Sequence, residues 1–503
     1  MAEYPEFKHG TYGEVIADGL SLANLNRNRM AIVYIGTAPV NQVKGGGKNV
    51  NKPIVVRNIA EAKRTLGYSD NWADFTLCEA MKVHLEQQKV GPLIFINVLD
   101  PATHRKSAGG TATLTPENGR VKIVNAEDAI IDTLAIVSSG TTLVEGTHYT
   151  ASYDCGKKCI VVTEKTKGSL GTSALSITWA KVDPSAVTTA DVIGATDNYG
   201  LNTGVYAIQN VYNVTGYIPA YILAPGFSSV PTIHQALWEN SLEIGKHWNA
   251  WMFVDMPIID GEGDSITLQT APTWKVQNGY TKDNESVFFP VVKGTDGKTY
   301  HLSVLNAANF QKLLVQHDGV PYMTGSNTEV SIVEDLYFGE NVVGRVYNDE
   351  VINRCLNANG INSAAFVGGK WVIWGMFAGS YNQDDATTIN VNDTCRMMLY
   401  YLTNDFQHRR NVDIDKPMTV NALKAMVAEE QARVDALLGI GALTYGKVTL
   451  DGSKEARSDV YSGDFRILFN VTNTPLAKSL TAIANWTADG FEVYFAAMDE
   501  LAI

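Results

Sequence analysis

Residues Val351–Phe377 read VINRCLNANGINSAAFVGGKWVIWGMF. Its first six residues place apolar side chains at helical spacing. Asn359-Gly360 then ends the helix, because glycine adopts positive φ without steric cost. The residues that follow are predicted to form two strands joined by a turn at Gly368-Gly369. The stretch therefore predicts a short helix followed by a β-hairpin.

Length and composition narrow the classes of protein to which the chain can belong. Its 503 residues are too many for one ordinary hydrophobic core, and they predict about two to four domains. A hydrophobic content of 45% and a charged content of 18% are typical of a folded globular protein. The net charge of −13 argues against a general nucleic-acid binder, which needs a basic surface.

The cysteines and the N-terminus bear on where the protein is made. Five cysteines are an odd number without the spacing of a disulfide framework, which fits free thiols in a reducing compartment. The first residues lack the apolar stretch of a secretory signal, and no apolar run is long enough to span a membrane. We therefore expect synthesis in the cytoplasm, and departure only as part of a particle. The cysteines are Cys78, Cys155, Cys159, Cys355 and Cys395.

An α/β pattern runs along the chain on both sides of a central interruption. Apolar runs that end at glycine or proline predict buried strands, and amphipathic runs between them predict helices. The strand–helix–strand unit within 217–257 should be a parallel crossover, and 285–302 should be a hairpin. The other predicted strands are 30–35, 53–57 and 93–98, and the predicted helices are 59–66, 75–86, 203–214, 233–244 and 303–316.

The interruption, residues 109–186, has no helical signal. Short strands separated by turn residues follow one another, which is typical of a β-sandwich or barrel. Because the α/β pattern resumes afterwards, we interpret this segment as an inserted all-β domain. Its predicted strands are 111–114, 120–124, 134–137, 149–153, 160–163 and 174–179.

Two long helices are predicted near the C-terminus. Asn392 or Asp393 can cap the first, and Thr419 can cap the second, which Gly439 ends. The second helix has one apolar side, and its charged residues are predicted to lie on or near the other side. These charged residues are Lys424, Glu429, Glu430 and Arg433.

Both ends of the chain look suited to contacts with other molecules. The pattern within residues 1–29 favours a strand flanked by glycines, and no helix is predicted there for it to pack against. These residues are either a frayed terminus or an arm that adds a strand to a sheet of another subunit. A strand at 461–471 and a short terminal strand are predicted at the other end. The candidate arm residues are Gly10, Thr11, Tyr12, Val15, Leu20 and Leu22, and, in the terminal strand, Phe491, Val493 and Phe495.

Motifs for catalysis, cofactors and metals are incomplete. The glycine loop 44–49 lacks phosphate-loop spacing and reads as a flexible loop, and 155–159 holds one C-x₃-C without a second pair. The acidic turn 260–264 lacks the acid that a calcium loop needs at its twelfth position. His234 and His247 flank one predicted helix outside any H-E-x-x-H motif, and they read as ordinary surface or interface histidines. We therefore expect no cofactor, no metal and no enzymatic activity.

The run LNANGIN, followed by KWVIWG, resembles the C-terminal core of contractile tail sheath proteins. The runs IGTAP, NKPIVV, LAPGFS and FVDMP resemble earlier parts of the same family, in the same order. GVPYMTGSN resembles the junction into the C-terminal domain, and Gly10-Thr11-Tyr12 resembles the N-terminal arm. The resemblance covers about residues 1–108 and 187–503 and leaves the β insertion outside it.

The resemblance implies a subunit that polymerises as stacked hexameric rings around a tail tube. Contraction would be a rigid-body rearrangement between two packings, and the terminal arms would keep the rings connected. The implied partners are further copies of the chain, the tail tube protein, and baseplate and tail terminator proteins. The second of the two long helices, which Thr419 caps, would either face the tube with its charged residues or pack within its own domain with these residues exposed. The protein would assemble in a bacterial host and leave in a phage or phage-tail-like particle.

The resemblance and the composition shifts together give a domain division. The α/β sheath domain is expected to be discontinuous, because the β insertion divides it. The division is an arm at 1–29, a sheath domain at 30–108 and 187–317, an inserted domain at 109–186, a C-terminal core at 318–490 and an arm at 491–503.

Two other classes of function stay open from the residues alone. The α/β crossover is a framework that hosts many enzymes, although no catalytic set accompanies it. The β insertion would suit a surface or adhesive protein, although no secretion signal supports this. Polymer formation by the purified protein would separate a sheath subunit from an enzyme.

Overall fold

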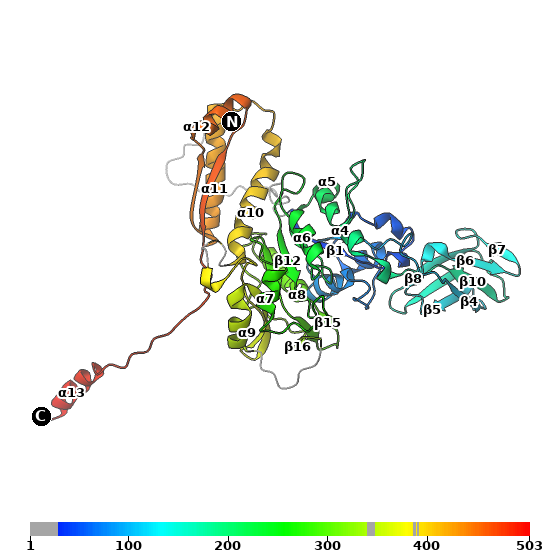
Figure 1. The fold of residues 1–503 in the computed structure, drawn as a ribbon, viewed down its shortest axis with the longest axis horizontal. Helices are drawn as coiled ribbons and strands as arrows, with labels where there is room; N and C mark the ends of the chain where they lie inside the picture. Colours follow the sequence, from blue (N-terminus) through cyan, green and yellow to red (C-terminus); the bar gives the residue numbers. More distant parts are fainter. Residues whose placement is uncertain (1–28, 340–347, 386–388, 390–391, 503) are drawn as a thin grey trace, which may run out of the picture. The chain divides into compact units, whose positions relative to one another are not determined.

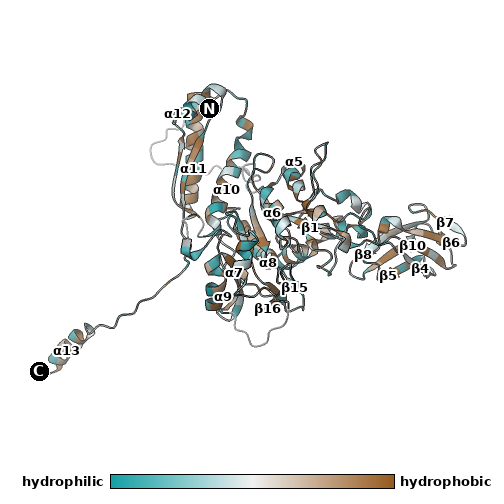
Figure 2. Ribbon diagram, in the orientation of Figure 1, coloured by the Kyte–Doolittle hydropathy of each residue, from teal (hydrophilic) through white to brown (hydrophobic). Residues whose placement is uncertain are grey.

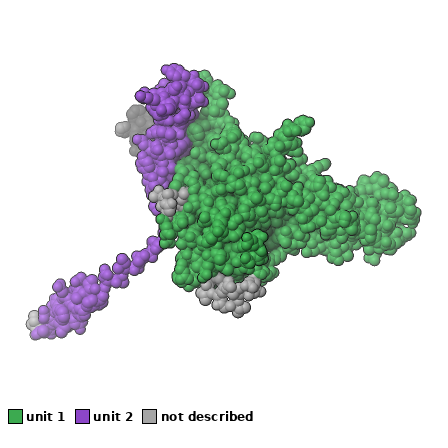
Figure 3. Space-filling model, viewed as in Figure 1, with its two compact units in different colours: residues 1–418 green, residues 419–503 purple. Residues whose placement is uncertain are grey.

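The structure is a computed structural model that describes residues 29–339, 348–385, 389 and 392–502. The candidate N-terminal arm residues, 10–22, lie outside the described residues. The chain forms two compact units, Met1–Met418 and Thr419–Ile503, which Figure 3 shows in different colours. We call them unit 1 and unit 2.

Unit 1 is built around an eight-stranded sheet with the order β18-β17-β13-β12-β11-β1-β3-β2 (Figure 1). The inner strands run parallel to their neighbours, and the two edge strands are antiparallel. Parallel strands are buried on both faces, and every residue of β3, β11 and β12 is buried. In Figure 2, brown hydrophobic stretches mark strands of this sheet. The predicted α/β core and its parallel β11–β12 crossover are confirmed. The strands are β1 Met30–Gly36, β2 Pro53–Val56, β3 Leu93–Asn97, β11 Ile218–Leu223, β12 Trp251–Asp255, β13 Glu285–Phe288, β17 Ile361–Val367 and β18 Lys370–Trp374.

The stretch Val351–Phe377 forms the predicted helix, turn and hairpin. Helix α9, Asp349–Cys355, leads through a 3₁₀ turn to Gly360, whose φ of 66° lies in the left-handed region. Strands β17 and β18 then form the hairpin. Because β17 also pairs in parallel with β13, the hairpin extends the large sheet.

Helices pack against this sheet, and most follow the predicted boundaries. The predicted helix 75–86 is a short α-helix that continues as a π-helix, Met81–Gln88. The predicted helix 203–214 is a 3₁₀-helix, Gly204–Asn210, followed by α5. The α-helices of unit 1 are α2 Ile59–Thr65, α3 Leu77–Ala80, α4 Thr189–Ile193, α5 Val211–Thr215, α6 Pro231–Glu239, α7 Ala271–Gln277, α8 Leu302–Gln316, α9, and α10 Asp393–Arg410.

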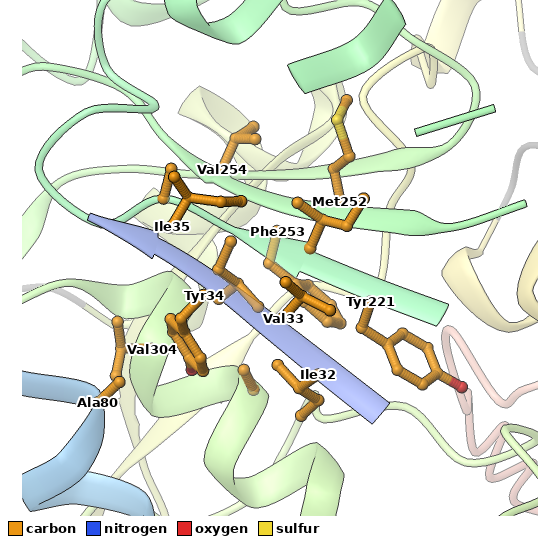
Figure 4. Packing of buried hydrophobic residues seen from close by; sticks show 14 of the residues in the cluster. Ile32, Val33, Tyr34, Ile35, Ala80, Tyr221, Met252, Phe253, Val254 and Val304 are labelled. Atoms are coloured by element: carbon orange, nitrogen blue, oxygen red, sulfur yellow. The ribbon is translucent and has the colours of Figure 1, made fainter. Parts of the chain in front are cut away.

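The main hydrophobic core lies between this sheet and its helices. Tyr34 of β1 is fully buried, and its hydroxyl contacts His84 Nε2 at 2.7 Å. The other ring nitrogen of His84 contacts Gln311 Oε1 of α8 at 2.7 Å, so both ring nitrogens of this buried histidine are paired. Each large apolar side chain buried here stabilises the fold by about 1.5–3 kcal/mol. Figure 4 shows Ile32, Val33, Tyr34 and Ile35 beside Tyr221, Met252, Phe253 and Val254, with Ala80 and Val304 nearby.

The predicted β insertion forms two antiparallel sheets around a hydrophobic cluster of its own. One sheet has the order β4-β10-β6-β7 and the other has the order β5-β9-β8. Inward residues alternate with exposed ones, as β5 illustrates, and they build a cluster separate from the main core. The all-β character of the insertion is confirmed. The strands are β4 Gly110–Leu114, β5 Arg120–Val124, β6 Ala135–Ser138, β7 Thr141–Leu143, β8 Tyr149–Asp154, β9 Cys159–Glu164 and β10 Leu175–Trp179.

Residues 41–44, which lead into the glycine loop, join the insertion to the α/β core. Asn41 Nδ2 donates to the carbonyls of Glu127 and Ala129, both at 3.0 Å. Lys44 Nζ donates to a third backbone carbonyl, that of Ile131, and pairs with Glu145 at 2.6 Å. Side chains of one segment therefore satisfy backbone carbonyls of the other, and the flexibility of the loop stays a prediction.

Two boundaries within unit 1 differ from the prediction. Helix α6 ends at Glu239, and the Ala236 carbonyl accepts from both the backbone N–H and the side-chain Nδ2 of Asn240, while the next N–H, of Ser241, donates to Trp238 in a tighter turn. Ile244 is buried, but it lies in the turn beyond the helix. Residues 285–302 are not one hairpin: β13 belongs to the large sheet and ends before Pro290, which cannot donate to a strand ladder. The hairpin itself is β14 Val291–Gly294 with β15 Thr299–Tyr300, and β16 Val333–Tyr337 completes its sheet.

Unit 2 contains a long helix, a two-stranded sheet and a terminal helix. Helix α11, Val420–Gly439, is capped as predicted by the Thr419 side chain, which accepts from the backbone N–H of Ala422. Strands β19 Leu443–Leu450 and β20 Ile467–Asn473 pair antiparallel, and α12 Lys454–Asp459 lies between them in sequence. The predicted strand 461–471 begins only at Ile467, because residues 460–462 continue α12 as a 3₁₀ turn.

The predicted terminal strand is wrong. Residues Gly490–Leu501 form helix α13. Phe491, Val493 and Phe495 alternate over too short a span to define a strand, whereas helical spacing relates Phe491, Phe495 and Met498 along one side. The helical pattern spans more residues than the strand pattern. A helix also forms its backbone hydrogen bonds within its own segment, so it needs no partner strand.

The compact units do not coincide with the domain division drawn from the sequence. The division between them falls at Met418, inside the range 318–490 predicted as one C-terminal core. The domain boundaries given above stay a prediction.

Candidate assembly surfaces

The charged side of α11 is the predicted tube-facing surface. Lys424, Glu429 and Arg433 are exposed, as expected. Glu430 is not: it is 1% exposed, on the side of α11 that buries Val434 and Leu437. Helical spacing explains the correction, because positions 430, 434 and 437 repeat along one face of the helix.

Helix α11 contacts the two-stranded sheet through a side chain that the sequence pattern did not single out. Gln431 Nε2 donates to the carbonyl of Gly446 at 3.2 Å, and Gln431 Oε1 accepts from the N–H of Val448 at 2.8 Å. The carboxamide thus bonds to backbone groups of β19 two residues apart, as a neighbouring strand would. A glutamine within a helix gives no sequence signal for this role.

The C-terminal segment of unit 2 exposes large apolar side chains. Residues 477–502 are all exposed, and they include Trp486 at 81% and Phe495 at 57%. Solvent-exposed apolar surface of this extent is characteristic of protein–protein contact sites. The apolar residues are Leu480, Ile483, Trp486, Phe491, Val493, Tyr494, Phe495, Met498 and Leu501.

The histidines singled out from the sequence have different surroundings. His247 is exposed, as one would expect of a surface histidine. His234 is 1% exposed and its Nε2 contacts Glu285 Oε2 at 2.5 Å, so it is a core residue. Its ring stacks on that of Tyr280 with the centroids 3.9 Å apart. Packing of this kind orients the ring and leaves no surface for a substrate.

The cysteine pair and the acidic turn form local structures. Cys155 lies on the turn between β8 and β9, Cys159 is the first residue of β9, and both are free thiols. Burial raises the pKa of the Cys155 thiol. In the acidic turn, the Asp260 carboxylate accepts from the backbone N–H groups of Glu262 and Asp264, as in an ordinary Asx turn.

Within 29–339, 348–385, 389 and 392–502, His, Cys, Asp and Glu side chains do not gather in a group of three that could hold a metal ion. Over the same ranges, no helix is both long enough and apolar enough to cross a bilayer.

Comparison with known proteins gives one relative in sequence and several in fold. No family model matches the chain. The tail sheath protein of Burkholderia phage BcepMu is 25% identical over 466 residues, which are 90% of this chain and 91% of that protein. The sheath complex of a PVC, an extracellular contractile injection system, in its contracted state has a TM-score of 0.52 at 10% identity, over 98% of this chain and 100% of that chain. The sheath tail protein of Desulfitobacterium hafniense has a TM-score of 0.48 at 12% identity, over 92% of this chain and 100% of that chain.

These relationships extend along nearly the whole chain. The phage protein aligns over nine tenths of both sequences, and the PVC sheath has the same fold over 98% of this chain. The motif stretch Val351–Phe377, which resembles the sheath family, forms the hairpin that completes the large sheet. The chain is therefore similar to a phage tail sheath protein along nine tenths of its length, and it has the fold of a sheath subunit of a contractile injection system.

Proposed function

We propose that the chain is the structural subunit of a contractile tail sheath, which polymerises as stacked hexameric rings around a tail tube. Contraction is a rigid-body rearrangement of subunits that drives the tube through a target cell envelope. The observation that carries this proposal is the 25% identity to a phage tail sheath protein over 90% of the chain. The PVC sheath that has the same fold is a sheath complex in a contracted state.

The proposed mechanism stores energy in packing and has no chemical step. A subunit with two stable arrangements against its neighbours can release the free-energy difference between them, without nucleotide or cofactor. A structural, non-enzymatic role fits the surroundings of His234. Its ring contacts the acidic Glu285 at hydrogen-bond distance, but it is buried and so offers no surface to a substrate.

The terminal segments are the proposed links between subunits. The N-terminal arm, around Gly10, Thr11 and Tyr12, would add a strand to a sheet of a neighbour. The C-terminal arm, by contrast, would dock as helix α13, since an apolar helix face binds in a groove. Its exposed apolar side chains support this proposal.

The proposed partners follow from the sheath function. They are further copies of the chain, the tail tube protein, and baseplate and tail terminator proteins. Lys424, Glu429 and Arg433 of α11 would face the tube, and Glu430 drops out of this set because it is buried. The β insertion, residues 109–186, would lie on the outside of the particle. Assembly would take place in the bacterial cytoplasm, before the phage or phage-tail-like particle is released.

The test is polymer formation by the purified recombinant protein, viewed by negative-stain electron microscopy. We expect hollow, striated tubes from the full chain and none from a version that lacks residues 1–20 and 490–503. Tubes from both versions would leave the sheath proposal standing and contradict the arms. A full chain that stays monomeric at high concentration would contradict the sheath proposal itself.

A further inference from the structure

A buried lysine lies where the motif stretch meets the α/β core. Lys275 belongs to α7 and is 2% exposed. Its ammonium group donates to the backbone carbonyl of Asn359 at 2.8 Å and to that of Gly379. Asn359 precedes β17, which begins at Ile361, and Gly379 lies in the segment that follows the end of β18 at Trp374. One side chain therefore contacts both ends of the β17–β18 hairpin.

The backbone around Lys275 is packed so closely that it requires glycine at both ends. A Cβ atom on Gly360 would lie 2.6 Å from the carbonyl oxygen of Tyr381 and 3.2 Å from Lys275 Nζ. A Cβ atom on Gly379 would lie 2.6 Å from Glu285 Cγ. The Asn-Gly pair of the motif is thus explained by a close approach as well as by the positive φ of Gly360.

Glu285 ties the same region to the sheet. It is fully buried at the start of β13, and its backbone carbonyl accepts from the N–H of Gly379 at 2.8 Å. Its carboxylate accepts from the N–H of Lys282 at 2.9 Å and contacts His234 at 2.5 Å. Burial lowers the pKa of Lys275 to about 8, and the negative charge of Glu285 opposes that decrease. The ammonium group therefore remains mostly charged at neutral pH.

We infer that Lys275 is a positioning residue that fastens both ends of the β17–β18 hairpin to the α/β core, so that hairpin and core move as one rigid body. We call the ammonium and its two carbonyl partners the Lys275 clasp. A sheet edge strand held only by its ladder can open locally, because local opening needs far less free energy than global unfolding. The clasp adds charge-assisted hydrogen bonds at the points where such opening would begin.

The primary test is hydrogen–deuterium exchange on the full chain with Lys275→Met, which removes the ammonium group and nearly keeps the side-chain length. We expect amide exchange at 359–363 and 376–381 to rise by about tenfold or more, as the loss of a buried charge-assisted bond predicts. Exchange in β1, residues 30–36, should stay within about twofold, because the core remains folded. Lys246→Met is the matched control, since Lys246 is exposed and forms an ion pair with Glu243, which is also exposed.

A second variant tests whether a change at one end of the β17–β18 hairpin alters exchange at the other end through the Lys275 clasp. Gly379→Ala presses on Glu285 at the end of the hairpin and leaves Lys275 intact. We expect faster exchange at 359–363 as well, and no such effect of Gly379→Ala when Lys275→Met is already present. Unchanged exchange at 359–363 in Lys275→Met, or an equal rise in β1, overturns the inference. If Lys275→Met does not fold, Gly379→Ala in the natural chain decides: loosening at both ends supports the clasp, and loosening at 376–381 alone overturns it.

Discussion

The His301 imidazole contacts the buried Glu79 carboxylate through Nδ1 at 2.6 Å, and the His301 backbone N–H donates to the same carboxylate at 2.7 Å. Burial lowers the pKa of His301, but the charge and hydrogen bond of Glu79 outweigh burial and raise it to about 9. Because the folded-state pKa exceeds the ordinary 6.5, this contact stabilises the fold fully below pH 6.5, and the stabilisation is lost as pH rises through about 9.

We therefore expect His301→Gln to lower the melting temperature at pH 6 and to have little effect at pH 10. Thermal unfolding of the two proteins across this range measures the difference, which is at most about 3 kcal/mol. His247→Gln is the control, because His247 is exposed. A destabilisation that is the same at both pH values would contradict this role of the pair.

Asp393 is a buried acidic residue with few hydrogen-bond partners for its carboxyl group. It is 5% exposed at the start of α10; its Oδ2 accepts from Thr324 Oγ1 at 3.1 Å, and its Oδ1 has no hydrogen-bond partner among the residues that the structure describes. Burial raises its pKa to about 7. The buried carboxyl group is therefore favourable to folding in its neutral form. This contribution is complete below pH 3.8 and is lost as the group ionises while pH rises through about 7.

Asp393→Asn should then be more thermostable than the natural chain at pH 8, with the difference shrinking toward pH 4. The amide keeps the shape of the carboxyl group and cannot ionise. The measurement is the melting temperature at both pH values. A variant that is less stable at pH 8 would show that the ionised carboxylate is needed.

The sequence predicted local features at residue scale and missed tertiary ones. The caps Asn392 and Thr419 and the turn at Gly360 are written in a few adjacent residues. The burial of Glu430 and the partners of Lys275 depend on segments far away in the chain. Charge in a sequence suggests exposure, and only packing shows which charged groups are buried.

At the scale of elements, α11 and β19 approach each other closely at Gly446. An added Cβ there would lie 2.1 Å from Val434 Cγ1. We expect Gly446→Ala to destabilise unit 2 by about 1–3 kcal/mol, a typical cost of overpacking. Hydrogen exchange of β19 and β20 in the full chain measures this effect. Val434→Ala should restore much of the loss in the double variant, and a simple sum of two losses would contradict the close approach.

Two substitutions in the C-terminal segment, residues 490–501, distinguish a strand from a helix. In a strand, Val493 would share a face with Phe491 and Phe495, whereas in α13 Met498 shares that face and Val493 points away from it. We expect Met498→Ser to reduce tube formation several-fold and Val493→Ser to leave it nearly unchanged, because hot-spot residues carry most of the binding energy. Sedimentation of polymer measures both. Loss with Val493→Ser and none with Met498→Ser would restore the strand prediction.

Elements with long, consistent patterns were predictable, and short ones were not. The buried strands of the large sheet are continuous apolar runs, and β1, β3 and β11 lie where those runs predicted them. At residues 491–495 a three-residue alternation competed with a longer helical pattern, and the longer pattern decides. That β17 pairs with β13 depends on strand order, which no local pattern contains.

At the scale of the whole molecule, the β insertion should be dispensable for polymerisation. Its hydrophobic cluster is separate, and its two ends meet, since the N–H of Lys106 donates to the carbonyl of Lys181 at 2.9 Å. Replacement of residues 107–180 by a short glycine linker should therefore leave a chain that still forms tubes. Electron microscopy should show tubes of smaller outer diameter. An absence of tubes from a folded deletion variant would place the insertion in the contacts between subunits.

The proposed function is a sheath of hexameric rings that this chain builds around a tail tube. Cryo-electron microscopy of tubes assembled from the purified full chain tests it most directly, because helical reconstruction gives the number of subunits per ring and the width of the channel. We expect six subunits per ring and an open channel wide enough to hold a tube, as the proposed sheath function requires. Filaments without a channel, or closed oligomers of another symmetry, would contradict the claim.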